Sequence, residues 1–584
     1  MRVFFLIVAV MVAGCHAQPS VPTFGPSNGA FHEGPHRQAA MLTGTGDVHF
    51  GVTTKNRQAR LLFNQGIGLV HGSWYYEAER SFHQVLAADP KCAMAYWGLT
   101  LANTPNPSRR IWFAWEAYQR RTQVSHRERL YIEAWARLLS AETEPKTVLV
   151  DAESGRRRAI PVPISAENQR RLRRDLSAIA EAFPNDVEAR ALWVRASILD
   201  PARPSIAPTA TDEERHLLKA IFTAMPLHPA NRYASELVID PVATGTKAAL
   251  SAPGIARMWH VAGNAYTRAG RHRDAAVWLD MAARVDHAHM KRTGALPFEH
   301  PNYARNAVAL CNSLIQTSQF ERAIALAKQM IRMPRHPRIN DGVVKRGQRA
   351  LITALATSQR WKTLTELAGG PYLADSEDAG SLLALVADGQ TEKARRTFGR
   401  PTRAAPTPPR RPTPASDVHG PPSWTTLPAP PFDLARGRGG KLALTDYAGR
   451  NVLVVFYLGA ACLHCVEQIH EIKPKTRAFK QAGIEIVTIG TDTVPDIKAF
   501  IQQLEETGDS PMPFPMLADP KGDTFKAWGC WDDFEGEALH GTFLIDAEGH
   551  IRWRDISVEP FMETDFLLDE CKRLLSFSPP AKGG

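Results

Sequence analysis

The chain has 584 residues, which is too long for one ordinary domain and suits two to four domains. Hydrophobic residues make up 44% and charged residues 22%, the proportions of a folded globular protein. The formal net charge of +10 is a mild bias over this length, and no long Lys/Arg run is interleaved with aromatic residues, so we expect no nucleic-acid binding.

The first residues are typical of an export signal. One basic residue precedes an apolar run from Val3 to Val12, which is too short for a mature membrane span. The run ends in V-A-G-C, which resembles a bacterial lipobox, so residues 1–14 are expected to be removed and Cys15 lipidated. We therefore expect an exported lipoprotein anchored in the membrane by lipid and facing the periplasm or cell exterior. The alternative is cleavage after Ala17, which gives a soluble periplasmic or secreted protein.

Residues 15–56 read as a linker, and helical periodicity dominates from 57 to 400. A weak internal repeat resembles the tetratricopeptide pattern. Its first copy is marked by Gly66, Ala78, Phe82 and Pro90, and its second by Trp259, Gly263, Tyr266, Ala275 and Ala282. Small residues let paired helices approach and large ones fill the gap. The prediction is an all-α, tetratricopeptide-like solenoid that binds a still unknown protein partner.

The composition then changes abruptly. Residues 401–431 hold 11 of the 43 prolines, and no packed core can form there. Residues 401–421 are predicted to be a semi-rigid spacer that lets the next domain reach the partner of the repeats.

After the spacer the pattern becomes α/β. Apolar runs predict strands, and amphipathic spacing predicts helices. The expected strands are 451–457, 483–490, 514–518 and a hairpin of 542–546 with 550–554, and the expected helices are 463–480, 494–506 and 560–576. Cys462 and Cys465 form a C-x-x-C at the first strand-to-helix junction, which is typical of a thioredoxin-like fold.

Three motifs of this part carry a family resemblance. A-P-P-F-D-L, L-T-D-Y-A-G-R-N-V-L-V-V-F-Y and G-T-F-L-I-D-A-E-G-H-I-R-W resemble the redoxin branch of the thioredoxin superfamily, the alkyl hydroperoxide reductase and thiol-specific antioxidant proteins. The resemblance covers residues 422–578 and leaves 579–584 as a tail. Upstream, A-P-G-I-A-R-M-W-H and R-V-D-H-A-H-M resemble the repeat region of uncharacterised planctomycete-type proteins that end in such a domain.

The sequence departs from the peroxiredoxin pattern. Those enzymes carry Pro seven and Thr three residues before the attacking Cys, whereas Cys465 is preceded at these distances by Leu458 and Cys462. The residues seven and three positions before Cys462, Val455 and Gly459, do not match this Pro and Thr either. Where peroxiredoxins have an Arg, and thioredoxin-like reductases a cis-Pro, this chain has His540. The resemblance therefore supports the fold more strongly than either activity.

The dithiol is the expected active site. A Cys at a helix N-terminus faces unpaired N–H groups and the positive end of the helix dipole, which favour the reactive thiolate. Cys462 would attack a substrate disulfide and Cys465 would resolve the mixed disulfide. His464 resembles the middle His of C-x-H-C disulfide isomerases and is expected to make the pair more oxidising than thioredoxin. The main hypothesis is an exported thiol–disulfide oxidoreductase acting on protein disulfides or dithiols.

Two alternatives stay open. In a thiol peroxidase, Cys465 would attack the peroxide, and Cys462 or Cys530 would resolve. In a repeat-based scaffold, the thiols would be structural. One C-x-x-C pair supplies too few ligands for zinc, so no metal and no cofactor is expected.

Overall fold

The computed structural model describes residues 34–149, 157–201, 203, 209–339, 342–374, 376–400, 419–506 and 511–577. The predicted signal peptide with Cys15, residues 401–418 of the spacer, and the tail lie outside these ranges. Within them, no helix combines the length and apolar character that crossing a membrane requires.

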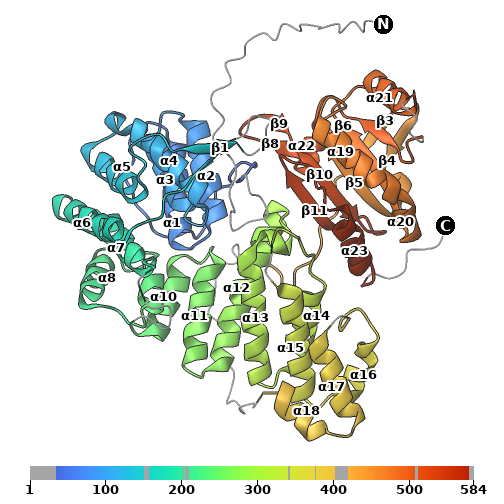
Figure 1. The fold of residues 1–584 in the computed structure, drawn as a ribbon. Coiled ribbons are helices and arrows are strands. Elements are labelled where there is room, and N and C mark those ends of the chain that lie inside the picture. The colour runs from blue at the N-terminus through green and yellow to red at the C-terminus, as the bar shows by residue number, and fades with distance from the viewer. Residues whose placement is uncertain are drawn as a thin grey trace, which may run out of the picture.

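The first part of the chain is helical, and successive helices pack beside one another along an arc (Figure 1). Its longer helices are α1 (Arg57–His71), α2 (Tyr75–Ala88), α3 (Ala93–Ala102), α4 (Pro107–Gln119), α5 (His126–Leu139), α6 (Ala166–Ala182), α7 (Val187–Ile198), α8 (Asp212–Ala224), α9 (Asn231–Glu236), α10 (Pro241–Ser251), α11 (Ala256–Arg268), α12 (His272–Thr293), α13 (Pro301–Gln316), α14 (Phe320–Ile331), α15 (Val343–Thr357), α16 (Trp361–Ala368), α17 (Glu377–Ala387) and α18 (Thr391–Phe398). Short 3-10 turns η1 (Arg121–Gln123) and η2 (Pro297–Glu299) and a small β1–β2 ribbon (Thr147–Leu149 with Arg157–Ala159) interrupt them.

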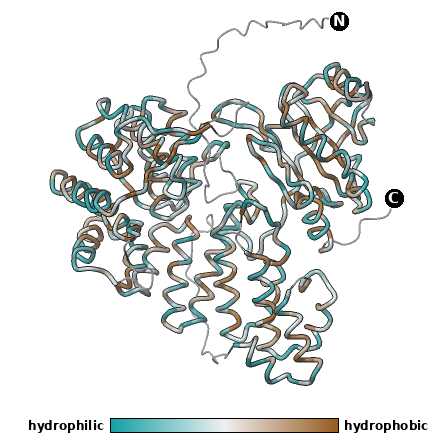
Figure 2. Tube along the Cα trace, viewed as in Figure 1, coloured by the Kyte–Doolittle hydropathy of each residue, from teal (hydrophilic) through white to brown (hydrophobic). Residues whose placement is uncertain are grey.

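Close helix packing explains the glycines of the repeat pattern. A Cβ on Gly66 of α1 would lie 2.6 Å from the ring of Phe82 in α2, and one on Gly263 of α11 would lie 2.6 Å from Leu279 in α12. Hydrophobic residues recur along the helices of this region (Figure 2), and buried side chains from α1 to α12 form one apolar cluster. The predicted helical region is confirmed, whereas its assignment to the tetratricopeptide class stays a prediction.

The C-terminal part is a mixed α/β domain around a seven-stranded sheet of order β11-β10-β5-β6-β7-β3-β4. Its strands are β3 (Asp433–Arg436), β4 (Lys441–Ala443), β5 (Asn451–Tyr457), β6 (Ile484–Gly490), β7 (Met516–Ala518), β10 (His540–Ile545) and β11 (Ile551–Ser557). The central strands β5, β6 and β7 are parallel, and β5 is buried along its whole length, as a strand covered on both faces must be. The helices are α19 (Leu463–Ile472), α20 (Thr476–Gln481), α21 (Val494–Glu506), α22 (Asp523–Trp528) and α23 (Thr564–Leu575), with 3-10 turns η3 (Leu444–Tyr447) and η4 (Lys473–Lys475) and a β8–β9 ribbon (Trp531–Asp532 with Glu537–Ala538).

Two local expectations differ from the structure. The helix predicted over 463–480 is divided into α19, η4 and α20, because Pro474 has no N–H group to continue the helical hydrogen bonds. Strands β3 and β4 were missed, because three or four half-buried residues at a sheet edge do not produce a strand-like apolar run.

The two parts are packed against each other, whereas the sequence predicted a domain that reaches out on a spacer. The Trp553 indole N–H donates to the Arg335 carbonyl at 2.7 Å, and His336 is 2.9 Å from Asp555. The Arg554 guanidinium binds both carboxylate oxygens of Glu299, at 2.9 and 2.7 Å. Proline content reports the stiffness of a connection and not the complementarity of the surfaces that it joins, so the docking could not be foreseen.

Glu570 of α23 gives a test of this docking. It is fully buried and accepts the Arg335 N–H and guanidinium, both at 2.7 Å, and the Arg573 guanidinium at 2.8 Å. Arg573 in turn donates to the carbonyls of Ile331 and Met333, at 2.8 and 2.7 Å.

We expect Glu570→Gln to loosen the docking, because it leaves guanidinium groups at a buried surface without their carboxylate. The free energy of unfolding should fall by up to roughly 3 kcal/mol, and by less than that because Arg335 is partly exposed. Hydrogen exchange of residues 331–339 should accelerate and the urea midpoint of the full chain should fall. The matched control is Asp569→Asn, one residue earlier and 77% exposed. Unchanged exchange in Glu570→Gln would contradict the assignment.

Candidate active site

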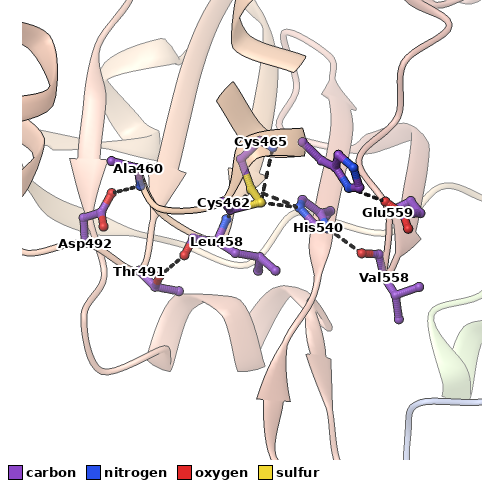
Figure 3. Close-up of a disulfide and its surroundings, with 10 residues drawn as sticks. Leu458, Ala460, Cys462, Cys465, Thr491, Asp492, His540, Val558 and Glu559 are labelled. Carbon is purple, nitrogen blue, oxygen red and sulfur yellow. Dashed lines mark hydrogen bonds and ion pairs between the residues drawn. A yellow bond between two sulfur atoms is a disulfide. The ribbon is translucent and has the colours of Figure 1, made fainter. Parts of the chain in front are cut away.

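Cys462 and Cys465 lie where β5 ends and α19 begins, and they form a disulfide (Figure 3). Cys462 is the N-cap of α19, and its sulfur accepts the Cys465 N–H at 3.2 Å. Cys462 is partly exposed, whereas Cys465 is fully buried. The predicted junction is therefore confirmed, and the two sulfurs differ sharply in their access to solvent.

The loop before the pair is held by the end of β6. Asp492 accepts the Ala460 N–H at 2.9 Å, and the Thr491 hydroxyl donates to the Leu458 carbonyl at 2.7 Å. Gly459 has φ +115°, and a Cβ there would lie 2.6 Å from the Asp492 carboxylate. Only glycine suits both the conformation and the contact. Thr491 and Asp492 were not singled out from the sequence, although polar residues at the carboxyl end of a central parallel strand are a usual signal of a site.

His540 of β10 faces both sulfurs. Its Nε2 lies 3.0 Å from the Cys465 sulfur and 3.7 Å from the Cys462 sulfur. Its Nδ1 lies 2.9 Å from the Val558 carbonyl, which can only accept, so Nδ1 carries the proton and the Nε2 lone pair points at the sulfurs. Burial lowers the pKa of His540 to about 4, and the nearby charge of His464 acts in the same direction. His540 is therefore a neutral proton acceptor near pH 7.

His464 is paired with Glu559. Its Nδ1 is 3.1 Å from the Glu559 carboxylate, and both side chains are partly exposed. Its charge lowers the pKa of His540, and the expectation that His464 makes the pair more oxidising stays a prediction.

Cys530 is not brought to the disulfide. It is fully buried and packs with Phe456, Trp528 and Phe543 in the cluster on one side of the sheet, whereas Cys465 belongs to the cluster on the other side. Burial raises the pKa of the Cys530 thiol well above its usual value. This placement gives no support to the resolving role weighed for Cys530.

Three groups of side chains have a spacing that could suit a metal ion within the described part of the chain: Cys462, Cys465 and His540; His71, Glu188 and His228; and Asp546, Glu548 and His550. In the first, the disulfide occupies both sulfurs. In the second, His228 Nδ1 accepts the Ala230 N–H at 3.1 Å, so Nε2 carries the proton and donates to Glu188 at 2.9 Å. That arrangement is a satisfied hydrogen-bond network. In the third group Asp546 is buried and already accepts the backbone N–H groups of Glu548 and His550.

The sequence profile of the AhpC/TSA family matches residues 426–554. A putative peroxiredoxin of Mycobacterium tuberculosis (strain H37Rv) is 31% identical over 129 residues, which cover 21% of this chain and 78% of that protein. The chain belongs to the AhpC/TSA family. Another member, peroxiredoxin Bcp of Escherichia coli K12, is 30% identical over 129 residues, which cover 21% of this chain and 79% of that protein. The solved structure of AhpC from Enterococcus faecalis is similar with a TM-score of 0.24 and 19% sequence identity. The aligned residues cover 26% of this chain and 94% of that chain.

The family match confirms the redoxin resemblance of the C-terminal domain. It leaves residues 57–400 outside the matched range, so the repeat class and the planctomycete likeness stay predictions. Because the relatives are named peroxiredoxins, the comparison favours the peroxidase alternative over general disulfide exchange.

The buried neutral His540 predicts a pH effect on the stability of the oxidised protein. Its pKa is about 4 when folded, against about 6.5 when unfolded, so the unfolded state binds the extra proton between these values. The contribution of the neutral His540 ring to the free energy of unfolding is fully present above about pH 6.5. It is lost as the pH falls towards 4, by roughly 3 kcal/mol at most. Urea unfolding at several pH values should show that the free energy of unfolding falls more steeply with decreasing pH for the wild type than for His540→Gln. Parallel curves would refute the assignment.

Proposed function

We propose that the redoxin domain is a thiol-dependent peroxidase in which Cys465 attacks the peroxide and Cys462 resolves the product. The observation that carries the proposal is the environment of the Cys465 sulfur. It accepts the Leu458 N–H at 3.2 Å and faces the Nε2 lone pair of His540 at 3.0 Å. One contact stabilises a thiolate and the other receives the thiol proton. The peroxiredoxin names of its relatives support the same reading.

The cycle starts from the reduced dithiol. His540 takes the Cys465 proton, and the thiolate attacks the terminal oxygen of the peroxide, which breaks the O–O bond. Cys465 becomes a sulfenic acid, and the leaving alkoxide or hydroxide takes the proton back from His540. The Cys462 thiol then attacks this sulfur and releases water, which forms the Cys462–Cys465 disulfide present in the structure. An external dithiol reduces the disulfide and closes the cycle.

His540 replaces the Arg of peroxiredoxins in this proposal. A neutral imidazole cannot polarise the peroxide as a fixed cation does, but it can deprotonate a buried thiol. Cys465 is covered by its disulfide partner in the oxidised form, and Cys462 is the exposed member of the pair. Once the bond is reduced, rotation of the Cys462 side chain is the movement by which a small oxidant would reach Cys465 in this proposal.

Disulfide exchange on a protein substrate is the second candidate. The observation in its favour is that Cys462, and not Cys465, is exposed at the N-cap of α19. A bulky substrate disulfide can meet only this sulfur, so Cys462 would be the attacking residue there, and Cys465 would resolve with His540 as its base.

Export, a lipid anchor at Cys15 and a protein partner for the helical region are further parts of the proposal. They are supported by the signal-like N-terminus and by the repeat pattern of the sequence.

The two candidates predict opposite results for the two cysteine variants. We expect Cys465→Ser to lose reaction with hydrogen peroxide by more than about 100-fold, because the attacking sulfur is gone. Cys462→Ser should still react and should accumulate a sulfenic acid on Cys465, detectable by mass after trapping with dimedone. Stopped-flow oxidation of the reduced full-length protein measures both.

Cys571→Ser is the control, because Cys571 is buried in α23 and takes no part in the disulfide. If Cys462→Ser is the inactive variant, and Cys465→Ser traps a mixed disulfide with an oxidised peptide, the peroxidase proposal fails and the exchange candidate holds.

A further inference from the structure

A cavity of about 290 Å³ lies between the helical region and the redoxin domain, apart from the disulfide. Its walls come from the segment before α1, from α2, from the end of α12 and start of α13, and from β11. The volume is near the lower end of the range of small-molecule pockets, which often lie at domain interfaces.

The wall of the cavity is rich in positive charge. Five arginines line it, against two glutamates, Glu77 and Glu299. Both glutamates are already engaged: Glu77 binds Arg80 at 2.9 Å and Glu299 binds Arg554 at 2.7 Å. The remaining arginines are Arg37, Arg257 and Arg305, and Arg257 pairs with Glu236 at 3.2 Å.

Arg37 and Arg305 are left without a carboxylate at ion-pair distance among the residues that the structure describes. Partial desolvation and the charges of Arg554 and Arg80 lower the pKa of Arg37, and the more distant carboxylate of Asp533 offsets this only in part, so positive charge here is incompletely compensated. Like charges gathered around one cavity repel each other, and an anion in the cavity would relieve that repulsion.

Aromatic side chains supply the apolar part of the wall. Trp74, Tyr75 and Tyr76 follow one another at the start of α2 and all line the cavity. The Trp74 ring packs on His289 and His300, with centroids 4.8 and 5.2 Å away. The indole nitrogen of Trp74 and Nδ1 of His289 are buried and meet no hydrogen-bond partner in the described chain, which is unusual for buried polar atoms.

We propose that this cavity binds a small organic anion. A carboxylate or phosphate group would be held by Arg37 and Arg305, since the guanidinium group matches the geometry of both oxyanions. An aromatic or apolar body would lie against Trp74 and its two tyrosine neighbours. The ligand would thus contact the helical region and the redoxin domain together. The proposal does not depend on which oxidant the disulfide site uses.

The test uses the full-length protein and phenyl phosphate as the probe, with isothermal titration calorimetry and the fluorescence change of the protein's tryptophans as readouts. We expect saturable binding of one probe per chain, weakened by added sodium chloride. Inorganic phosphate should bind more weakly, since it lacks the aromatic body, and benzyl alcohol should not bind, since it lacks the charge.

Arg305→Gln should weaken phenyl phosphate binding by roughly tenfold or more. Arg37→Gln, in the segment before α1, should weaken phenyl phosphate binding by a similar factor. Because the two variants change separate segments of the chain, a folding defect in one of them would not decide the test. The matched control is Arg349→Gln on α15, whose side chain is 78% exposed outside the cavity, and it should bind as the wild type does. The proposal is overturned if no saturable binding occurs at millimolar probe, if benzyl alcohol binds equally well, or if neither cavity variant changes the affinity.

Discussion

The hydrogen bond from His540 Nδ1 to the Val558 carbonyl determines what the disulfide site can do. A carbonyl accepts and never donates, so this one contact fixes the imidazole tautomer and turns the Nε2 lone pair towards Cys465. Burial keeps the ring neutral, because the hydration that a charged imidazole would lose outweighs the attraction of the Asp555 carboxylate. The buried sulfur of the pair therefore faces a neutral imidazole that can accept a proton, at the position where the peroxiredoxin pattern has an arginine.

That hydrogen bond depends on the position of β11. His540 pairs with Ser557 across the β10–β11 ladder, and Val558 follows directly. On one side of β11, Trp553 and Asp555 bind residues of the helical region, and on the other side Arg554 and Ile556 border the interdomain cavity. The same strand thus joins the docking surface, the cavity and the carbonyl that orients His540. The helical region is part of the surroundings of the redox site and not only an attached module.

The structure shows what the departures from the peroxiredoxin pattern change at the site. Cys462 takes the place of a threonine, and so puts a second sulfur within bonding distance of the first. Under the proposed peroxidase cycle, resolution by a cysteine one helical turn away would require no large unfolding of α19, and the oxidised form would keep its fold. Cys530, which could have been a resolving residue by its place in the sequence, is separated from the pair by the sheet itself.

The sequence alone determined the helical region, the α/β class of the last domain, the strand-to-helix junction and the two cysteines, because these follow from local periodicity and short spacing. It also pointed to His540 by comparison with a motif, but not to its tautomer, which depends on Val558 in a segment eighteen residues later. The docking of the two parts, the cavity between them and the placement of Cys530 were decided only by the tertiary structure. Each depends on which segments meet in space although they are far apart in the chain, and local pattern carries no information about that.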